Sequence, residues 1–295
     1  MSSLKSAKPI WLRERKMLCS TTSPVQLALS GLRQRVPGGP QVGELGLGAY
    51  DLYLRALAVF YPITKDRVAE ALRLLDQAIA IDRHYGPALS WAICHFRLVQ
   101  DGWAEDPDTS RRNAVGLARK ALEAAQNDQA VLVNAALVLA HLGEDIGTMI
   151  GLVDRALAVN PSFARGWNIS GLLRTLAGQP DLAIEHVETS LRLSPRERMG
   201  VPLFAMGMAY FVERRFDEAA ASLPLAIQDN LGSTNPYRYP AVCYAHMGRL
   251  DEARAVVAKL RANTPLVMLS DLPYVNPEDR ELLLPGLRLA VDEGA

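Results

Sequence analysis

The chain repeats a helical pattern about every 34 residues, and this period constrains the fold more than any single residue does. Small residues give the register, because Ala183, Ala219 and Ala253 follow one another at intervals of 36 and 34 residues. Repeats of this length are typical of α-solenoids. Each unit has apolar surface that only its neighbours can cover, so the units stack. The sequence therefore predicts an all-α protein.

Turn residues agree with this register. Gly143, Gly178 and Gly248 stand where the two helices of a pair should be joined, and Pro161 and Pro195 stand where one pair should end. Glycine is common at helix C-termini, and proline cannot continue a helix interior. We expect a right-handed α-solenoid of about six helix pairs with a C-terminal capping helix. The pairs should begin near Leu52, Ala88, Ala130, Ala164, Gly200 and Thr234.

The composition divides the chain into three segments. Residues 1–48 carry seven basic side chains against two acidic ones and contain the strings STTSP and VPGGPQVGELGLG, so we expect a mobile basic leader. Residues 49–265 should form the run of helix pairs, and residues 266–295 should form the C-terminal cap. The cap helix should begin at Asn276-Pro277, because asparagine caps helices and proline fits their first position.

Two local features interrupt the regular pattern. The string DGWAEDPDTS, residues 101–110, lacks the spacing of a calcium loop, so we expect a solvated loop that caps the next helix. Trp103 in this loop either packs on that helix, which we favour, or contacts another protein. Pro224, Pro240 and Pro285 fall inside predicted helices, where each should cause a kink or a late helix start.

Charge and hydropathy exclude several classes of function. The 32 basic and 32 acidic side chains leave no excess charge to attract nucleic acid. The longest apolar stretch, residues 130–142, is shorter than the roughly 20 residues of a membrane-spanning helix, so we expect no membrane insertion. The three cysteines form no Cys-x-x-Cys pair, and no signal-peptide core follows the basic start. These features predict a cytoplasmic protein.

No pattern in the sequence predicts catalysis. The five histidines include no His-x-x-x-His pair of a helical metal site. The string GELGLG, residues 43–48, lacks the phosphate-loop spacing and favours a linker. Cys94 and Cys243 lie among apolar neighbours, where cysteine usually behaves as a small buried hydrophobe. We therefore predict no enzymatic activity, no cofactor and no metal site.

The first helices of the pairs should line an inner, concave surface that carries a ladder of polar residues. Asn134, Asn168 and Arg238 occupy equivalent positions on three of these helices. We expect the two asparagines to be exposed, since an amide can both donate to and accept from the backbone of an extended peptide. Arg165 lies one helical turn earlier and should bind a carboxylate.

Apolar residues continue this predicted groove. Phe204, Met208 and Phe211 follow on the next first helix, and an exposed apolar groove often marks a partner site. The alternative is that these three side chains pack inside the solenoid. The predicted partner-binding groove therefore combines a polar middle with an apolar neighbouring section.

The repeat unit resembles the tetratricopeptide repeat over residues 50–265. One unit carries the pattern in Trp167, Gly171, Ala183 and Pro195. The following unit carries it in Gly207, Tyr210, Phe216, Ala219 and Ala226. This resemblance implies stacked helix pairs that bind other proteins, but the lysine-and-asparagine carboxylate clamp of chaperone-binding members is not reproduced.

Longer strings resemble the carboxy-terminal repeat region of bacterial class III adenylate or guanylate cyclases. They include AYDLYLRAL, DGWAEDP, LVDRALAVNPSFARGW, HMGRLDEAR and NPEDRELLLPGLRLA, and the resemblance covers roughly residues 49–292. It implies an accessory region that accompanies a metal-dependent cyclase domain. The 48 residues before AYDLYLRAL are too few for that domain, so cyclase activity is not implied here.

Repeat architecture without a catalytic pattern predicts a non-enzymatic scaffold that binds a protein segment in its concave groove. The alternative is a regulatory accessory region, or a truncated fragment, of a nucleotide cyclase signalling protein. The expected partner is then a protein or peptide segment, with a signalling enzyme as one option. Self-association stays open, because an exposed groove or an incomplete cap can recruit a second copy.

Overall fold

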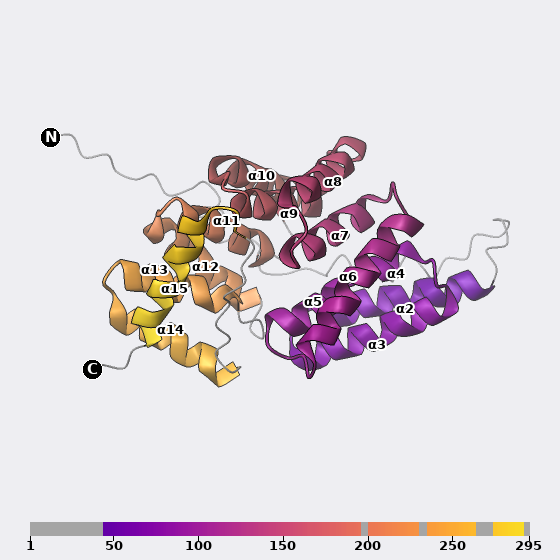
Figure 1. Cartoon of the computed structure of the whole chain (residues 1–295), viewed down its shortest axis with the longest axis horizontal. Helices are drawn as coiled ribbons and strands as arrows, with labels where there is room; N and C mark the ends of the chain where they lie inside the picture. Colours follow the sequence, from indigo (N-terminus) through magenta and orange to yellow (C-terminus); the bar gives the residue numbers. More distant parts are fainter. Residues whose placement is uncertain (1–43, 196–199, 230–234, 264–273, 292–295) are drawn as a thin grey trace. The chain divides into compact units, whose positions relative to one another are not determined.

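The computed structural model describes residues 44–195, 200–229, 235–263 and 274–291, and every regular element in these ranges is an α-helix (Figure 1). The all-α prediction is confirmed. Cys19, the predicted leader up to residue 43 and the first part of the predicted cap, residues 266–273, lie outside the described residues.

The described helices form six successive pairs followed by a single helix. The first helices are α2 (Glu44–Phe60), α4 (Gly86–Ser90) with α5 (Ile93–Gln100), α7 (Gln129–His141), α9 (Ala164–Leu176), α11 (Gly200–Val212) and α13 (Asn235–His246). The second helices are α3 (Lys65–Ile81), α6 (Pro107–Ala124), α8 (Ile146–Val159), α10 (Pro180–Leu193), α12 (Phe216–Asp229) and α14 (Leu250–Asn263). The single helix is α15 (Pro277–Val291).

The predicted register agrees closely with the helix starts. The last four pairs begin within one residue of the predicted positions, and the second begins two residues early. The first pair departs most, because α2 starts at Glu44 rather than near Leu52. Its buried residues Ala49, Ala56 and Phe60 face the rest of the fold at helical spacing, which accounts for a helix that runs through this region.

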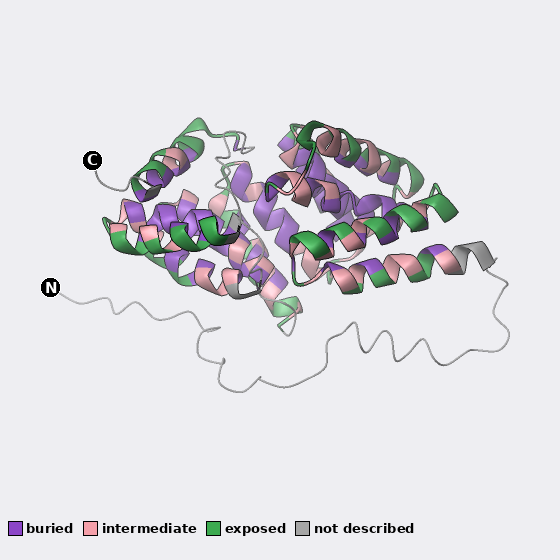
Figure 2. Cartoon of the chain, turned by 90° about the horizontal axis from the view of Figure 1, so that it is seen from below, coloured by how far each residue is buried: buried purple, intermediate pink, exposed green. Residues whose placement is uncertain are grey.

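The two helices of a pair occupy different layers. First helices contact first helices of neighbouring pairs, as α9 contacts α7 and α11, and we call α2, α4, α5, α7, α9, α11 and α13 the inner helices. Second helices pack between one inner helix and the next, as α10 packs on α9 and α11. Figure 2 shows buried residues along the faces where helices meet and exposed residues on the outward faces. In α7, every residue from Val131 to Ala140 is buried.

Glycines permit the closest helix contacts. A Cβ atom added to Gly171 in α9 would lie 2.5 Å from Val187 Cγ2 and 2.9 Å from the backbone oxygen of Ala183 in α10. The equivalent Gly207 in α11 packs against Leu223 of α12, whose Cγ would be 2.5 Å from an added Cβ. The predicted role of small residues in close backbone approach is confirmed at both pairs.

Residues with positive φ join the paired helices, as the sequence predicts. Gly143, Gly178 and Gly248 have φ angles of 102°, 75° and 73°. Arg214 takes this position in the fifth pair, with a φ of 59°. Gly102, with a φ of 70°, lies between α5 and α6. The left-handed conformation is unstrained for glycine and uncommon for other residues, so four of these five described turns use the residue that fits best.

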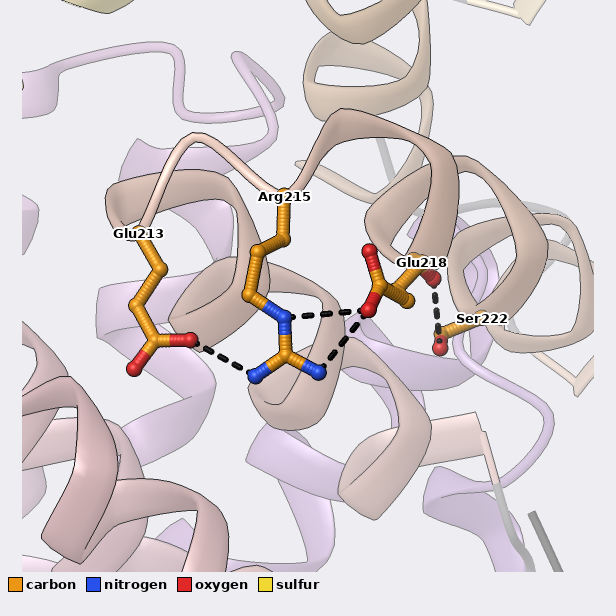
Figure 3. Close-up of polar contacts among 4 residues, drawn as sticks. All are labelled: Glu213, Arg215, Glu218 and Ser222. Carbon is orange, nitrogen blue, oxygen red and sulfur yellow. Dashed lines mark hydrogen bonds and ion pairs between the residues drawn. The ribbon is translucent and has the colours of Figure 1, made fainter. Parts of the chain in front are cut away.

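A charged turn motif follows this position in the last two pairs. Figure 3 shows Arg215 between Glu213 and Glu218, with Nη1 2.8 Å from Glu213 Oε2 and Nη2 2.9 Å from Glu218 Oε1. Its guanidinium carbon lies 4.4 Å from the centre of the Tyr210 ring. In the next pair Arg249 pairs with Glu252 and lies 4.7 Å from the centre of the Tyr244 ring. These exposed contacts, the turn ion pairs, hold adjacent helix ends together.

The insertion in the second pair caps a helix, as predicted. Asp106 is the N-cap of α6, and its Oδ1 accepts a hydrogen bond from the backbone nitrogen of Thr109 at 3.0 Å. Trp103 packs against the main hydrophobic core, which confirms the preferred of its two predicted roles. The prediction of a solvated loop is wrong for Asp101, which is fully buried.

The three helix-interior prolines do not delay a helix start. Pro224, Pro240 and Pro285 lie inside α12, α13 and α15, which begin several residues earlier. That part of the prediction is wrong, because each helix begins before its proline and continues past it. The predicted kinks remain predictions.

The segment before α15 closes the inner helices at the C-terminal end. Asn276 Oδ1 accepts a hydrogen bond from the Glu278 backbone nitrogen at 3.0 Å, which confirms the predicted helix start. The Tyr274 hydroxyl contacts the Tyr239 hydroxyl of α13 at 2.8 Å, and both rings are buried. The Val275 backbone nitrogen donates to the backbone oxygen of Leu176, the last residue of α9, at 2.9 Å. Helix α15 packs on α13 and α14 and caps the last pair.

Candidate functional site

A partly open cavity of about 100 Å³ lies among the inner helices. Its lining comes from the α2–α3 turn and from α5, α7, α9, α11 and α13, so all six helix pairs contribute. Most of the lining is apolar and includes Phe60, Phe96, Leu172, Phe204 and Tyr239. A concave apolar site with a few polar groups is the usual form of a ligand site.

Aromatic contacts fix the walls of this cavity. Phe60 packs edge-on against the buried Trp91, with ring centres 4.9 Å apart. In the C-terminal pairs, Tyr239 packs edge-on against Phe204 at 5.6 Å and Phe211 at 5.3 Å. Edge-to-face pairs of this kind are favourable beyond the area that they bury. The cavity is therefore bounded by side chains that have little freedom to collapse into it.

Arg165 lines the cavity and is held by a chain of hydrogen bonds. Its Nε and Nη2 atoms donate to Asn134 Oδ1 at 3.1 and 2.8 Å. Asn134 Nδ2 in turn donates to Ser90 Oγ at 3.3 Å, and Ser90 Oγ donates to the backbone oxygen of Pro87 at 2.8 Å. Helices α9, α7 and α4 thus orient one guanidinium group.

The guanidinium of Arg165 keeps a free donor. Among the described residues no carboxylate forms an ion pair with it, and Asn134 takes only its Nε and Nη2 atoms. The side chain is half-buried, so its charge is partly shielded from water. A positive group that is oriented and lacks an anionic partner is suited to bind an anion.

His141 is a neutral polar group in the lining. Its Nδ1 lies 2.9 Å from the backbone oxygen of Leu137, and a carbonyl oxygen only accepts hydrogen bonds, so Nδ1 carries the proton. Burial lowers the pKa of His141 to about 4, because the charged form is poorly solvated there. Near pH 7 the ring is therefore neutral, and its Nε2 is an acceptor.

A buried ion pair lies at the end of α5, beside the cavity. Arg97 Nη2 is 3.0 Å from Asp101 Oδ2, and Arg97 Nη1 donates to Gln100 Oε1 at 2.7 Å. Arg238 of α13 is also buried; burial lowers its pKa to about 10, and the negative charge of Asp101 opposes that shift. Nearby positive charge offsets the desolvation of Asp101, which explains why this residue is not in the solvated loop that the sequence predicted.

The structure separates the six residues of the predicted groove into two sets. Arg165, Phe204 and Met208 line the cavity, although Met208 is only 3% exposed. Asn134, Asn168 and Arg238 are not part of the lining and are 2%, 4% and 1% exposed. The expected exposure of the two asparagines is therefore wrong, because neighbouring inner helices cover them.

Asn134 was expected to hydrogen-bond the backbone of a bound peptide. In the structure its Oδ1 accepts hydrogen bonds from Arg165 and orients that side chain. The alternative of internal packing holds for Phe211, which is fully buried, and in part for Phe204, which is half-buried. Sequence reasoning missed His141, Phe60 and Tyr239 as cavity residues. Phe60 and His141 each end an inner helix, and Tyr239 lies one position after Arg238 of the predicted ladder, so only Tyr239 could have been found from the repeat register.

The remaining histidines, cysteines and acidic residues were the other candidates for chemistry in the described part of the chain. No group of three His, Cys, Asp or Glu side chains there is placed to hold a metal ion. Cys94 and Cys243 are buried as predicted, and burial raises the pKa of Cys243 to about 12 and that of Cys94 still further. Both thiols therefore stay protonated and unreactive near neutral pH. No described helix is long and apolar enough to cross a membrane.

Comparison with known proteins shows the fold but no family. No family model matches the chain, and no curated protein matches it. A human IFIT1 dimer with m7Gppp-AAAA is similar, with a TM-score of 0.60 and 15% identity over 82% of this chain and 55% of that one. The APC/C hetero-tetramer Cut9–Hcn1 is similar with a TM-score of 0.54 and 16% identity, over 84% of this chain and 47% of the other.

A thermophilic TPR protein from Thermus thermophilus, TTC0263, matches over 62% of this chain and 91% of that one, with 19% identity and a TM-score of 0.47. The chain spans about half the length of the IFIT1 and Cut9–Hcn1 chains that it matches. Together with the six helix pairs, the likeness to IFIT1 and to Cut9–Hcn1 shows that the fold is an α-solenoid of helix pairs.

Proposed function

We propose that this protein is a non-enzymatic scaffold whose inner helices bind a segment of a partner protein. The observation that supports it is that all six helix pairs contribute to one partly open apolar surface around Arg165. Stacked repeats present such surfaces on a rigid frame, and a concave apolar region marks an interaction site.

The partner segment contacts the half-buried residues of the inner helices. Phe204 and Val201 of α11 offer apolar surface, and Arg165 of α9 offers a positive charge. Asn134 accepts two hydrogen bonds from Arg165 and so holds the guanidinium in place. Partner segments with an apolar side chain next to an acidic one therefore fit this surface best.

A pull-down from the native host followed by binding of the purified partner tests this function. The variant carries Arg165→Ala and Phe204→Ala, and the control carries Arg192→Ala, an arginine of α10 whose side chain donates to Thr189 on the surface. We expect one protein to bind the wild type and the control and to be lost with the double variant. A partner that binds the double variant with unchanged affinity contradicts the assignment of this surface, and recovery of only a second copy of the chain contradicts a heterologous partner.

A second candidate function rests on the strings that resemble cyclase-associated repeats. In this case the protein is a regulatory accessory region of a nucleotide cyclase, acting on a catalytic domain through the same inner surface. Adding the purified chain to a class III cyclase domain from the same genome should then change the rate of cyclic nucleotide formation. An unchanged rate and no binding rule out this function, whereas the chain alone with ATP and manganese should form no cyclic nucleotide.

A further inference from the structure

We propose that the cavity among the inner helices binds a short branched-chain monocarboxylic acid, with the apolar end inside and the carboxylate on Arg165. The size of the cavity restricts its occupant. Its volume of about 100 Å³ is smaller than the roughly 150 Å³ of an engineered apolar cavity that holds benzene. A branched chain of four or five carbons fits this space, whereas a long acyl chain or a large ring would have to extend out of it.

The lining explains why the enclosed part of the ligand is apolar. Phe60, Ile93, Ile169 and Leu172 come from three different helix pairs and offer no hydrogen-bonding side-chain group. The Arg97 side chain in the lining already pairs with Asp101. A sugar or an extended peptide would bring more polar groups into this space than its few polar lining side chains, such as His141 and Gln100, could pair. A hydrocarbon group needs no such partners.

Arg165 explains why the other end of the ligand is a carboxylate. The guanidinium is oriented by Asn134, which takes its Nε and Nη2 atoms, and the side chain lines the cavity and is half-buried. A carboxylate there gains a charge-assisted hydrogen bond without reorganisation of the arginine. Ser90 fixes Asn134 in the orientation that presents its oxygen to Arg165. The arrangement is thus a preformed site for one negative charge beside a small apolar space.

This inference does not rest on the proposed scaffold function, because a small acid can bind the purified chain without any partner. The free acid is favoured over the end of a peptide because the enclosed space has room for one small group and is mostly apolar, whereas a peptide would bring further backbone donors and acceptors into it. Acid binding is measured on the purified chain alone, so its outcome is read independently of the pull-down, even though both sites include Arg165.

Isothermal titration with 4-methylpentanoate tests the site. Its neutral isostere 4-methylpentanamide removes the charge, and acetate removes the apolar body. We expect the acid to bind at least tenfold more tightly than either control, in line with the roughly 1.5–3 kcal/mol of a hydrogen bond to a charged group. Equal binding of the amide, or no binding of the acid at millimolar concentration, overturns the proposal.

Two variants separate the charge from the space. Arg165→Gln should weaken acid binding at least tenfold and leave amide binding unchanged, whereas Leu172→Phe should fill the cavity and weaken both. Arg192→Gln is the charge-matched control and should bind like the wild type, with circular dichroism to confirm that each variant is folded. Full acid binding by Arg165→Gln or by Leu172→Phe contradicts the proposed site. A tripeptide ending in leucine that binds more than tenfold more tightly than the free acid shows that the occupant is a peptide end, which also overturns the proposal.

Discussion

Charged side chains at the turns between paired helices are exposed and recur from one pair to the next, whereas the charged groups around the cavity are buried or half-buried and differ between pairs. Arg215 and Arg249, 34 residues apart, form the same contacts with a glutamate and a tyrosine in successive turns. In the described ranges, the ion pair of Arg97 with Asp101 and the hydrogen-bonded Arg165 have no counterpart in another repeat.

The contrast indicates which charged residues stabilise the fold and which ones distinguish this repeat protein from others. Exposed pairs contribute little each, but their recurrence marks the register of the stack. Buried polar groups are costly to remove singly, because a partner is left behind without compensation. The buried polar residues of the inner helices are therefore the ones that distinguish this chain from other proteins built of stacked helix pairs.

The largest expected effect is at the buried ion pair. Asp101→Ala leaves the buried positive charges of Arg97 and Arg238 without this carboxylate, so it should lower the free energy of unfolding by about 3–5 kcal/mol. Urea denaturation followed by circular dichroism measures this loss. Asp154→Ala is the matched control, since Asp154 pairs with Arg174 on the surface, where its side chain is 47% exposed. If Asp101→Ala lowers the free energy of unfolding by no more than Asp154→Ala does, the buried ion pair is not more important for stability than an exposed one.

Close packing between layers should give the next largest effect. Gly171→Ala places a Cβ 2.9 Å from the Ala183 backbone oxygen, and such overpacking costs about 1–3 kcal/mol. Gly151→Ala on α8 is the control, because nothing lies within 4 Å of its added Cβ and a helical glycine replaced by alanine gains about 0.5–1 kcal/mol. Thermal unfolding should shift in opposite directions for the two variants, and a shift in the same direction contradicts the packing assigned to α9 and α10.

His141 should make the inner helices sensitive to acid in a way that the turns are not. Its folded pKa of about 4 lies below the usual value of 6.5, so the unfolded chain takes up the proton first as the pH falls. The stability that the neutral ring contributes is present above pH 6.5 and is lost between pH 6.5 and 4, by about 2 kcal/mol at pH 5.

Urea denaturation at pH 7.5 and pH 5 measures this difference, and His141→Gln should lack that part of the loss. His95 and His186 also have pKa values lowered by burial and contribute in the same direction, so the comparison is between the variant and the wild type. If both lose the same stability between the two pH values, His141 is not the group responsible.

The turn ion pairs should give the smallest effects. Arg215→Ala removes two ion pairs and an aromatic contact near the surface, so it should cost about 1 kcal/mol, and Arg249→Ala, which removes one ion pair and one aromatic contact, should cost no more. Melting curves at low and high salt check both variants, since the wild type should lose part of this contribution to screening. If Arg215→Ala or Arg249→Ala lowers the free energy of unfolding by more than Gly171→Ala does, the turn ion pairs are not the weakest of these contacts.

The sequence was sufficient for the fold because the repeated positions carry it. Alanines and glycines that recur every 34 to 36 residues mark where helices must approach closely, and Gly178 and Gly248 mark the turns. Close helix contacts and tight turns are needed within every helix pair, so the same residue types recur in each repeat. The helix starts could therefore be predicted to within a residue or two for most pairs.

The candidate site was less predictable because burial there depends on helices that are far apart in sequence. Arg165, Phe204 and Met208 could be chosen from their positions on successive first helices. The burial of Asn134 and Asn168 follows from inner helices of neighbouring pairs, and that of Asp101 depends on nearby positive charges, including Arg238 on α13. Periodicity identifies the face of a helix, but it does not show how tightly the opposite element closes over that face.

The hydrogen bond from Val275 to Leu176 has a consequence for how this chain can vary. Stacks of repeats commonly lengthen or shorten by whole units, because each unit needs only its neighbours. Here the backbone that follows the sixth pair returns to the end of α9 in the fourth, so the fifth and sixth pairs are enclosed by one bridge. A change in the number of pairs between Leu176 and Val275 would therefore break this hydrogen bond unless the segment before α15 found another acceptor, whereas a change before α9 would leave it in place.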